Sequence, residues 1–128
     1  MRNVSVGFVS RTASPGNSAF RIVKSMLRHP DLIAGEGRPC TEMMQAHPGR
    51  VIAKVGADGV YCALLIQAGL GVALKVSDGH AIASALAMAA ALEELGLRPR
   101  PASLIARPNV NTRGETVGEL RVNGGLKQ

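Results

Sequence analysis

Aromatic side chains are nearly absent from this sequence of 128 residues, which has no tryptophan, one tyrosine and two phenylalanines. Proteins that bind single-stranded nucleic acids stack the bases on aromatic side chains, so this mode of binding is nearly excluded. Lys and Arg number 15 against 9 Asp and Glu, but the basic residues stand singly or in pairs and form no run. Basic nucleic-acid binding therefore remains only as a third hypothesis.

Long apolar runs and cysteine pairs are also missing. No apolar stretch reaches the ~20 residues of a membrane-spanning helix, and residues 1–16 lack the apolar segment of a secretory signal. The sequence therefore predicts a cytoplasmic protein without a membrane partner. Cys40 and Cys62 have no CxxC or metal-ligand spacing, so we expect reduced thiols and no metal site. We expect the histidines at the surface: His29, His47 and His80.

Aliphatic side chains are abundant instead. Hydrophobic residues make up 46% of the chain and charged residues 19%, a balance that excludes an intrinsically disordered protein. A chain of 128 residues is long enough for one domain. We expect residues 1–17 to form a lead-in segment, in which Val4–Val9 has the pattern of a strand, and residues 18–128 to form the domain.

Helices are predicted in two parts of the chain. Apolar residues at helical spacing predict a first helix that begins at Asn17 or Ser18 and ends before Pro30, and a short helix is predicted around residues 41–46. Residues 81–95 are rich in Ala and Leu and predict the longest helix. Its candidate N-caps are Ser77 and Asp78, and Gly96 is expected to end it.

Strands are predicted between these helices. The apolar runs 51–55, 60–66 and 70–76 are separated by short Gly-containing segments and predict antiparallel hairpins, and a final strand is predicted over 116–122. The fold class is therefore α+β, with an antiparallel β-meander covered by helices. The run 60–66 is apolar at nearly every position, so both of its faces need cover. Two long helices do not suffice, and we expect something outside this chain to cover the remaining face.

Lys54 is the first candidate for chemistry. Partial desolvation on an inner strand would favour the neutral amine, which can act as a base or proton shuttle. Gly56, two positions later, would leave room for a ligand along the strand. The alternative is that Lys54 merely extends into solvent from an edge strand.

The Gly-rich string GEGRPC supplies the second set of candidates. Alternating glycines would let Glu36 and Arg38 face a polar ligand, and Arg38 could hold a carboxylate in bidentate fashion. The alternative is a Gly-rich turn with an internal pair between Glu36 and Arg38. Cys40 is interpreted as a packed thiol, because no histidine stands beside it to activate it.

A serine nucleophile with its own base is missing. The Ser-x-x-Lys arrangement places a lysine one helical turn after the serine, where it can accept the hydroxyl proton. No serine in this sequence has a lysine three residues later. The chain therefore cannot supply that nucleophile–base pair by itself.

Four strings, in this order, nevertheless form a recognisable set: HPDLIAGEGRPCTEMM, RVIAKVGADGVYCALL, LGVALKVSDGH and NVNTRGETVGELRV. They closely resemble the bacterial type II asparaginase family of the Rhizobium kind, which is similar in fold to serine β-lactamases and glutaminases. The resemblance implies hydrolysis of the side-chain amide of L-asparagine to aspartate and ammonia. It also implies a serine nucleophile served by lysines, with a zinc site close to the pocket.

The resemblance assigns roles to individual residues. Lys54 matches the lysine that pairs with a second serine in the family's active site, and is the expected catalytic residue. Cys40 matches a pocket cysteine, and Glu36 with Arg38 match the glycine-flanked pair near it. Gly56 matches the turn after the catalytic lysine. The expected substrate-binding residues are therefore Glu36, Arg38, Cys40 and Gly56.

The family's Ser-x-x-Lys nucleophile, second serine and zinc ligands lie in an N-terminal half that has no counterpart here. The sequence thus looks like the C-terminal half only, so we expect no cofactor or metal in this chain. We expect an amino-acid amide as substrate and little turnover by the chain alone. Completion would come from a separately encoded N-terminal half or from a homo-oligomer, unless the chain is a truncated gene product. The alternative is a non-catalytic module that binds a small molecule or another protein.

Overall fold

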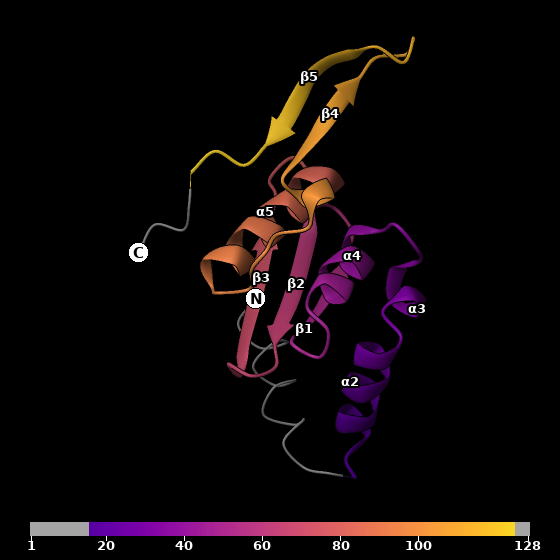
Figure 1. Ribbon diagram of the computed structural model, residues 1–128, viewed down its shortest axis with the longest axis vertical. Coiled ribbons are helices and arrows are strands. Elements are labelled where there is room, and N and C mark those ends of the chain that lie inside the picture. The colour runs from indigo at the N-terminus through magenta and orange to yellow at the C-terminus, as the bar shows by residue number, and fades with distance from the viewer. Residues whose placement is uncertain (1–15, 125–128) are drawn as a thin grey trace.

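The computed structural model describes residues 16–124, and its elements confirm an α+β fold (Figure 1). The strand pattern at Val4–Val9 lies outside the described residues. Among the residues described, no helix is both long and apolar enough to cross a membrane. The elements are α2 (Ser18–Arg28), α3 (Asp31–Ala34), α4 (Pro39–Ala46), β1 (Val51–Val55), β2 (Val60–Leu65), β3 (Leu70–Lys75), α5 (Ala81–Glu94), the 3₁₀ helix η1 (Ala102–Leu104), β4 (Ala106–Val110) and β5 (Thr116–Arg121).

The three predicted central strands form the expected meander. They make one antiparallel sheet in the order β1-β2-β3, with Lys54 opposite Cys62 and Cys62 opposite Ala73. β1 is therefore an edge strand of this sheet, and the prediction that Lys54 lies on an inner strand was wrong. A strand is inner only if a partner pairs along its second edge, and among the described residues β1 pairs with β2 alone.

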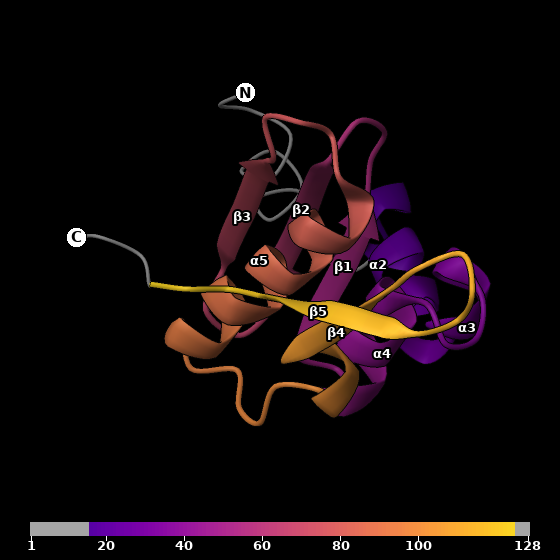
Figure 2. The same ribbon diagram turned by 90° about the horizontal axis from the view of Figure 1, so that it is seen from above.

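Burial differs between the two faces of the sheet. Tyr61, Ala63 and Leu65 of β2 are buried, whereas the alternating residues of the same strand are only half-buried. The helices α4 and α5 pack on the sheet next to each other, α4 at β1 and α5 over β2 and β3 (Figures 1 and 2). The second face of β2 is only half-buried, and an apolar strand needs cover on both sides.

Helix α5 begins at a different cap from the one predicted. His80 is the N-cap, and its Nδ1 accepts a hydrogen bond from the Ala83 backbone N–H at 3.2 Å. The Asp78 carboxylate instead accepts a hydrogen bond from the His80 backbone N–H at 3.0 Å, and among the described contacts it therefore caps no N–H of the helix itself. Gly96 follows the last turn with φ +92°, a left-handed conformation that glycine adopts without strain, as predicted. His80 is exposed, as expected.

The last two strands form a hairpin of their own. β4 and β5 pair with each other in a two-stranded antiparallel sheet, which stands away from the meander (Figures 1 and 2). The sequence predicted only the second of these strands, since Pro108 within β4 argues against a strand. The root of the hairpin is anchored, because Leu104 of η1 is buried and the Ser103 hydroxyl donates a hydrogen bond to the Glu42 carboxylate of α4.

Two loops at one end of the meander touch through glycines. Gly59, between β1 and β2, has φ +70°, and its carbonyl accepts a hydrogen bond from the Val76 N–H at 3.0 Å. A Cβ added to Gly59 would lie 2.9 Å from Cα of Gly79, which is backbone and cannot move away as a side chain can. The close approach of these two loops therefore requires glycine at position 59.

We expect the Gly59→Ala substitution to lower the free energy of unfolding by about 2 kcal/mol, because a strained φ and a backbone clash add together. Gly114→Ala is the matched control. That residue also has a left-handed φ, +82°, but no atom lies within 4 Å of an added Cβ. Its cost should be about 1 kcal/mol, from backbone strain alone. Equal losses in urea unfolding would contradict the role assigned to the contact with Gly79.

His47 is buried, with 4% of its surface exposed, so the prediction of a surface histidine was wrong. The residue ends α4, and the chain folds back over it. Burial lowers the pKa of His47 below its ordinary value, and the Arg50 charge adds to this, while a hydrogen bond with the Pro99 backbone opposes it. His29 is exposed, as expected.

This shift makes stability depend on pH. The unfolded chain binds a proton at His47 near pH 6.5, above the pKa in the folded protein, so the unfolded state holds more protons below that pH. We therefore expect the His47 contribution to stability to be present above pH 7 and to be lost as the pH falls through 6.5 toward the folded-state pKa. Urea unfolding at pH 7.5 and 5.5 measures it. His47→Gln should flatten the dependence and exposed His29→Gln should not; equal slopes would contradict this account.

Candidate functional site

A cavity of about 360 Å³ brings two of the candidate residues together. It lies where the start of α4, the end of β1, β2, the start of α5 and β4 meet. Arg38 and Cys40 line it, and these are two of the residues that the sequence singled out. The other lining residues are Ala34, Gly37, Pro39, Val55, Tyr61, Ala81, Ile82 and Arg107.

Cys40 is the best-connected side chain of this cavity. Pro39 occupies the first position of α4, where its missing N–H is no loss, and thereby places Cys40 in the first turn. The Cys40 Sγ accepts hydrogen bonds from the Tyr61 hydroxyl at 3.0 Å and from the Val55 backbone N–H at 3.3 Å. The prediction of a packed thiol is confirmed, since 1% of the residue is exposed. Cys40 therefore ties α4 to the end of β1.

Tyr61 was not predicted as a site residue. It is 1% exposed, and burial raises the pKa of its phenol well above the ordinary value, with the hydrogen bond to Cys40 acting in the same direction. The phenol thus stays protonated and serves as a donor. A single tyrosine on an otherwise aliphatic strand was the available signal, because a buried hydroxyl needs a polar partner.

Two guanidinium groups line the same cavity from distant parts of the chain. Arg38 precedes α4 and is exposed, while Arg107 lies on β4 and is half-buried. Within residues 16–124, no hydrogen bond or ion pair is found for either side chain. No Asp or Glu is among the lining residues. The lining therefore carries positive charge without an acidic side chain, although the charge of Glu42, outside the lining, acts on Tyr61.

Glu36 and Gly56 lie outside this cavity. Glu36 is exposed, and the alternative of a pair between Glu36 and Arg38 is not found among the described ion pairs. The expected room beside Gly56 is taken by Val60, whose Cβ lies 3.1 Å from the place of an added Cβ. Glycine at position 56 therefore accommodates a neighbouring side chain.

Lys54 lies on the opposite face of β1 from the cavity. Side chains alternate along a strand, and Val55, the next residue, lines the cavity. Lys54 is exposed, and its Nζ donates a hydrogen bond to the Val55 carbonyl at 2.7 Å. The expected partial desolvation of Lys54 is not found among the described residues, since its side chain is exposed.

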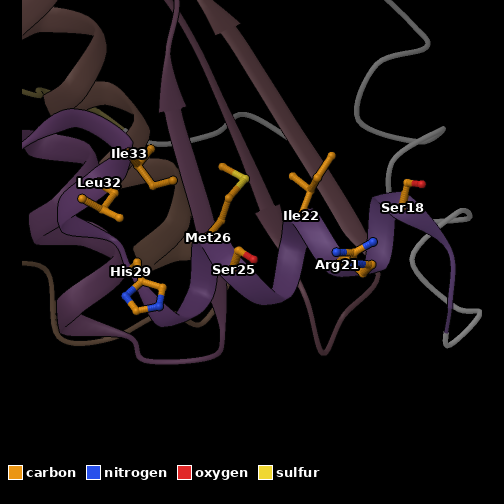
Figure 3. Close-up of a pocket in the computed structure, with 8 residues that line it drawn as sticks. All are labelled: Ser18, Arg21, Ile22, Ser25, Met26, His29, Leu32 and Ile33. Atoms are coloured by element: carbon orange, nitrogen blue, oxygen red, sulfur yellow. The ribbon is translucent and has the colours of Figure 1, made fainter.

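A second hollow, of about 430 Å³, lies along α2 and α3, away from these residues (Figure 3). Ser25 and His29 both line it one helical turn apart, but no hydrogen bond joins their side chains among the described contacts. The hollow is open to solvent, since 52% of the surface of Ile22 and 78% of that of Leu32 are exposed. The hollow is thus an apolar groove without an activated nucleophile.

A metal site was not expected in this chain. Over residues 16–124, no group of three or more His, Cys, Asp or Glu side chains is placed to hold a metal ion. The two cysteines stand apart, with Cys40 in the first turn of α4 and Cys62 on β2. The residues described here therefore do not fit the zinc site that the resemblance implies.

Comparison with known proteins gives one match and one absence. The family model described as L-asparaginase II matches residues 3–122, which is nearly the whole chain. No curated protein matches the chain. The matched range includes every residue that lines the cavity around Cys40. This chain belongs to the L-asparaginase II family.

Proposed function

We propose that this chain is the C-terminal, sheet-bearing half of a Rhizobium-type L-asparaginase, which hydrolyses the side-chain amide of L-asparagine to L-aspartate and ammonia. The family match supports the amide substrate. The observation that carries the proposal is the cavity around Cys40, in which Arg38 and Tyr61 meet within the matched residues. This cavity offers donors and positive charge for a small polar substrate.

The nucleophile comes from a segment outside these 128 residues in this proposal. A serine hydroxyl adds to the amide carbon, the nitrogen leaves as ammonia after protonation, and water then hydrolyses the acyl–serine ester. The cavity described here has no serine or threonine in its lining. Its groups can bind and orient the substrate, but none can form that ester.

Lys54 is proposed as the proton-handling residue of the assembled site. Its support is the match with the family's catalytic lysine and its place on the open edge of β1, where a docking segment can reach the ammonium. Among residues 16–124, its Nζ bonds a neighbouring carbonyl. Docking would desolvate the amine and favour its neutral form, which accepts a proton. Gly56 and Glu36 lie outside the cavity of the free chain and are proposed to contact the substrate only in the assembled site.

The partner is proposed to be a nucleophile-bearing half, with self-association as the second possibility. Such a partner would cover the half-buried second face of β2 and the edge of β1 that no other described strand pairs with. Residues 18–128 are proposed to act as one domain in the cytoplasm. The zinc of the family is proposed to be held by the other half, and no step here depends on it.

Ammonia release from L-asparagine tests this function. We expect no significant rate from the chain alone, and a rate well above background after mixing with a Ser-x-x-Lys-bearing half of an L-asparaginase II protein. A rate from the chain alone that survives the loss of Lys54 would contradict the proposal. A mixture that forms a complex yet releases no ammonia would favour the non-catalytic binding module.

A further inference from the structure

We infer that Arg38 and Arg107 together form a binding site for the carboxylate of an amino acid, with Arg107 as a specificity-determining residue. The inference that this ligand carries an amide at its other end rests on the proposed function. The carboxylate site itself rests on the cavity and can be tested without turnover. Nothing in the sequence spacing connects these two residues, since Arg38 precedes α4 and Arg107 lies on β4.

The fold holds Arg107 at this place through the root of the hairpin. Ser103 of η1 donates a hydrogen bond to Glu42 of α4, and Leu104 is buried in the core. β4 begins two residues later, at Ala106. The same helix α4 starts directly after Arg38. The hairpin root is thus tied to α4 by one hydrogen bond and packs on α5, and this places Arg107 on the same cavity as Arg38.

The charge of the cavity calls for an anion. Two guanidinium groups line it without any acidic residue in the lining, and Arg107 is half-buried without an ion pair among residues 16–124. Two guanidinium groups on one cavity attract an anion, and no acidic side chain in the lining competes with it. The first turns of α4 and α5 also line the cavity, and their N-terminal ends add positive potential.

The guanidinium groups suit a carboxylate, and the size of the cavity suits a small ligand. The guanidinium group is a planar fork that holds a carboxylate through two parallel hydrogen bonds, and two such forks can bind both oxygens. The rest of the lining is mostly apolar and includes Val55 of β1 and Ile82 of α5. A volume of about 360 Å³ lies at the small end of the range for ligand pockets. This suits a short amino acid better than a nucleotide.

Binding of L-asparagine to the chain alone, followed by calorimetry or by chemical shifts in NMR, tests the site. We expect Arg107→Gln and Arg38→Gln each to weaken binding at least about 10-fold, as for loss of one charged hydrogen-bonding partner. Arg107→Lys, which keeps the charge and loses the fork, should fall between. Arg113→Gln, in the exposed turn of the same hairpin, is the matched control and should bind as the original chain does.

A comparison of ligands gives a test that needs no substitution. L-asparagine methyl ester, which lacks the carboxylate, should bind at least about 10-fold more weakly than L-asparagine. Equal binding of the two would overturn the inference, as would inorganic phosphate competing with equal affinity, which would indicate a non-selective anion site. Unchanged binding by Arg107→Gln, or no measurable binding of L-asparagine, would also overturn it. None of these binding results measures ammonia release by the assembled protein, so the carboxylate site and the proposed function can fail independently.

Discussion

Replacing Cys40 by alanine is expected to lower the free energy of unfolding by about 3 kcal/mol. The substitution removes a side chain that is 1% exposed, and it takes the hydrogen-bond acceptor away from the Tyr61 hydroxyl and the Val55 N–H. A buried donor left without a partner costs ~1–3 kcal/mol, and the lost packing adds about 1 kcal/mol. Urea unfolding at neutral pH measures the difference.

Two other cysteine substitutions separate the causes of this loss. Cys40→Ser keeps an acceptor for the same two donors, so its cost should be about half that of the alanine variant. Cys62→Ala is the matched control, because Cys62 is half-buried on β2 and accepts no hydrogen bond that the structure records among its described residues. Its cost should stay near 1 kcal/mol or below. Equal costs for Cys40→Ala and Cys62→Ala would show that the contacts to Sγ do not stabilise the fold.

Replacing Lys54 by alanine is expected to lower ammonia release by the assembled protein ~10²–10⁴-fold, the usual contribution of a positioned general base. Folding of the chain should be nearly unaffected, because Lys54 is exposed and its one recorded hydrogen bond is to the neighbouring carbonyl. The loss should therefore appear in kcat while the unfolding midpoint stays unchanged. The measurement compares ammonia release by the two assembled proteins at saturating L-asparagine.

Lys24→Ala is the matched control for this result. Lys24 is also exposed, but it lies on α2, away from the edge of β1. Its substitution should leave the rate within about 2-fold of the original, as expected for a surface change away from the chemistry. A similar loss for both lysines, or a rate unchanged by Lys54→Ala, would remove Lys54 from the site.

The elements that the sequence predicted are those that rest on local periodicity. The meander strands and α5 follow alternating or helical patterns of apolar residues, and they were located to within one or two residues. α3 was missed, because four residues are too short for a periodic signal. The cap of α5 was misplaced, because it is an imidazole nitrogen of His80 rather than the oxygen of Ser77 or Asp78 that normally caps a helix.

The candidate site was predictable only where it is local in the chain. Arg38 and Cys40 belong to one Gly-rich string, and both line the cavity. Arg107 could not be linked to them, because tertiary contacts bring β4 there: η1 packs on α5 and Ser103 donates a hydrogen bond to Glu42 of α4. Lys54 was placed on an inner strand because a sequence shows which segments can form strands, but not whether a further strand pairs along the edge.

Native mass spectrometry of the chain with a Ser-x-x-Lys-bearing half of an L-asparaginase II protein, combined with acetylation of surface lysines, shows whether such a half docks at the edge of β1. We expect a complex of the two halves in which Lys54 is protected from acetylation while Lys24 reacts as in the chain alone. The contrary result is the absence of that complex, or a complex in which Lys54 reacts as readily as it does in the free chain. Either outcome would show that the other half does not complete a site at the edge of β1.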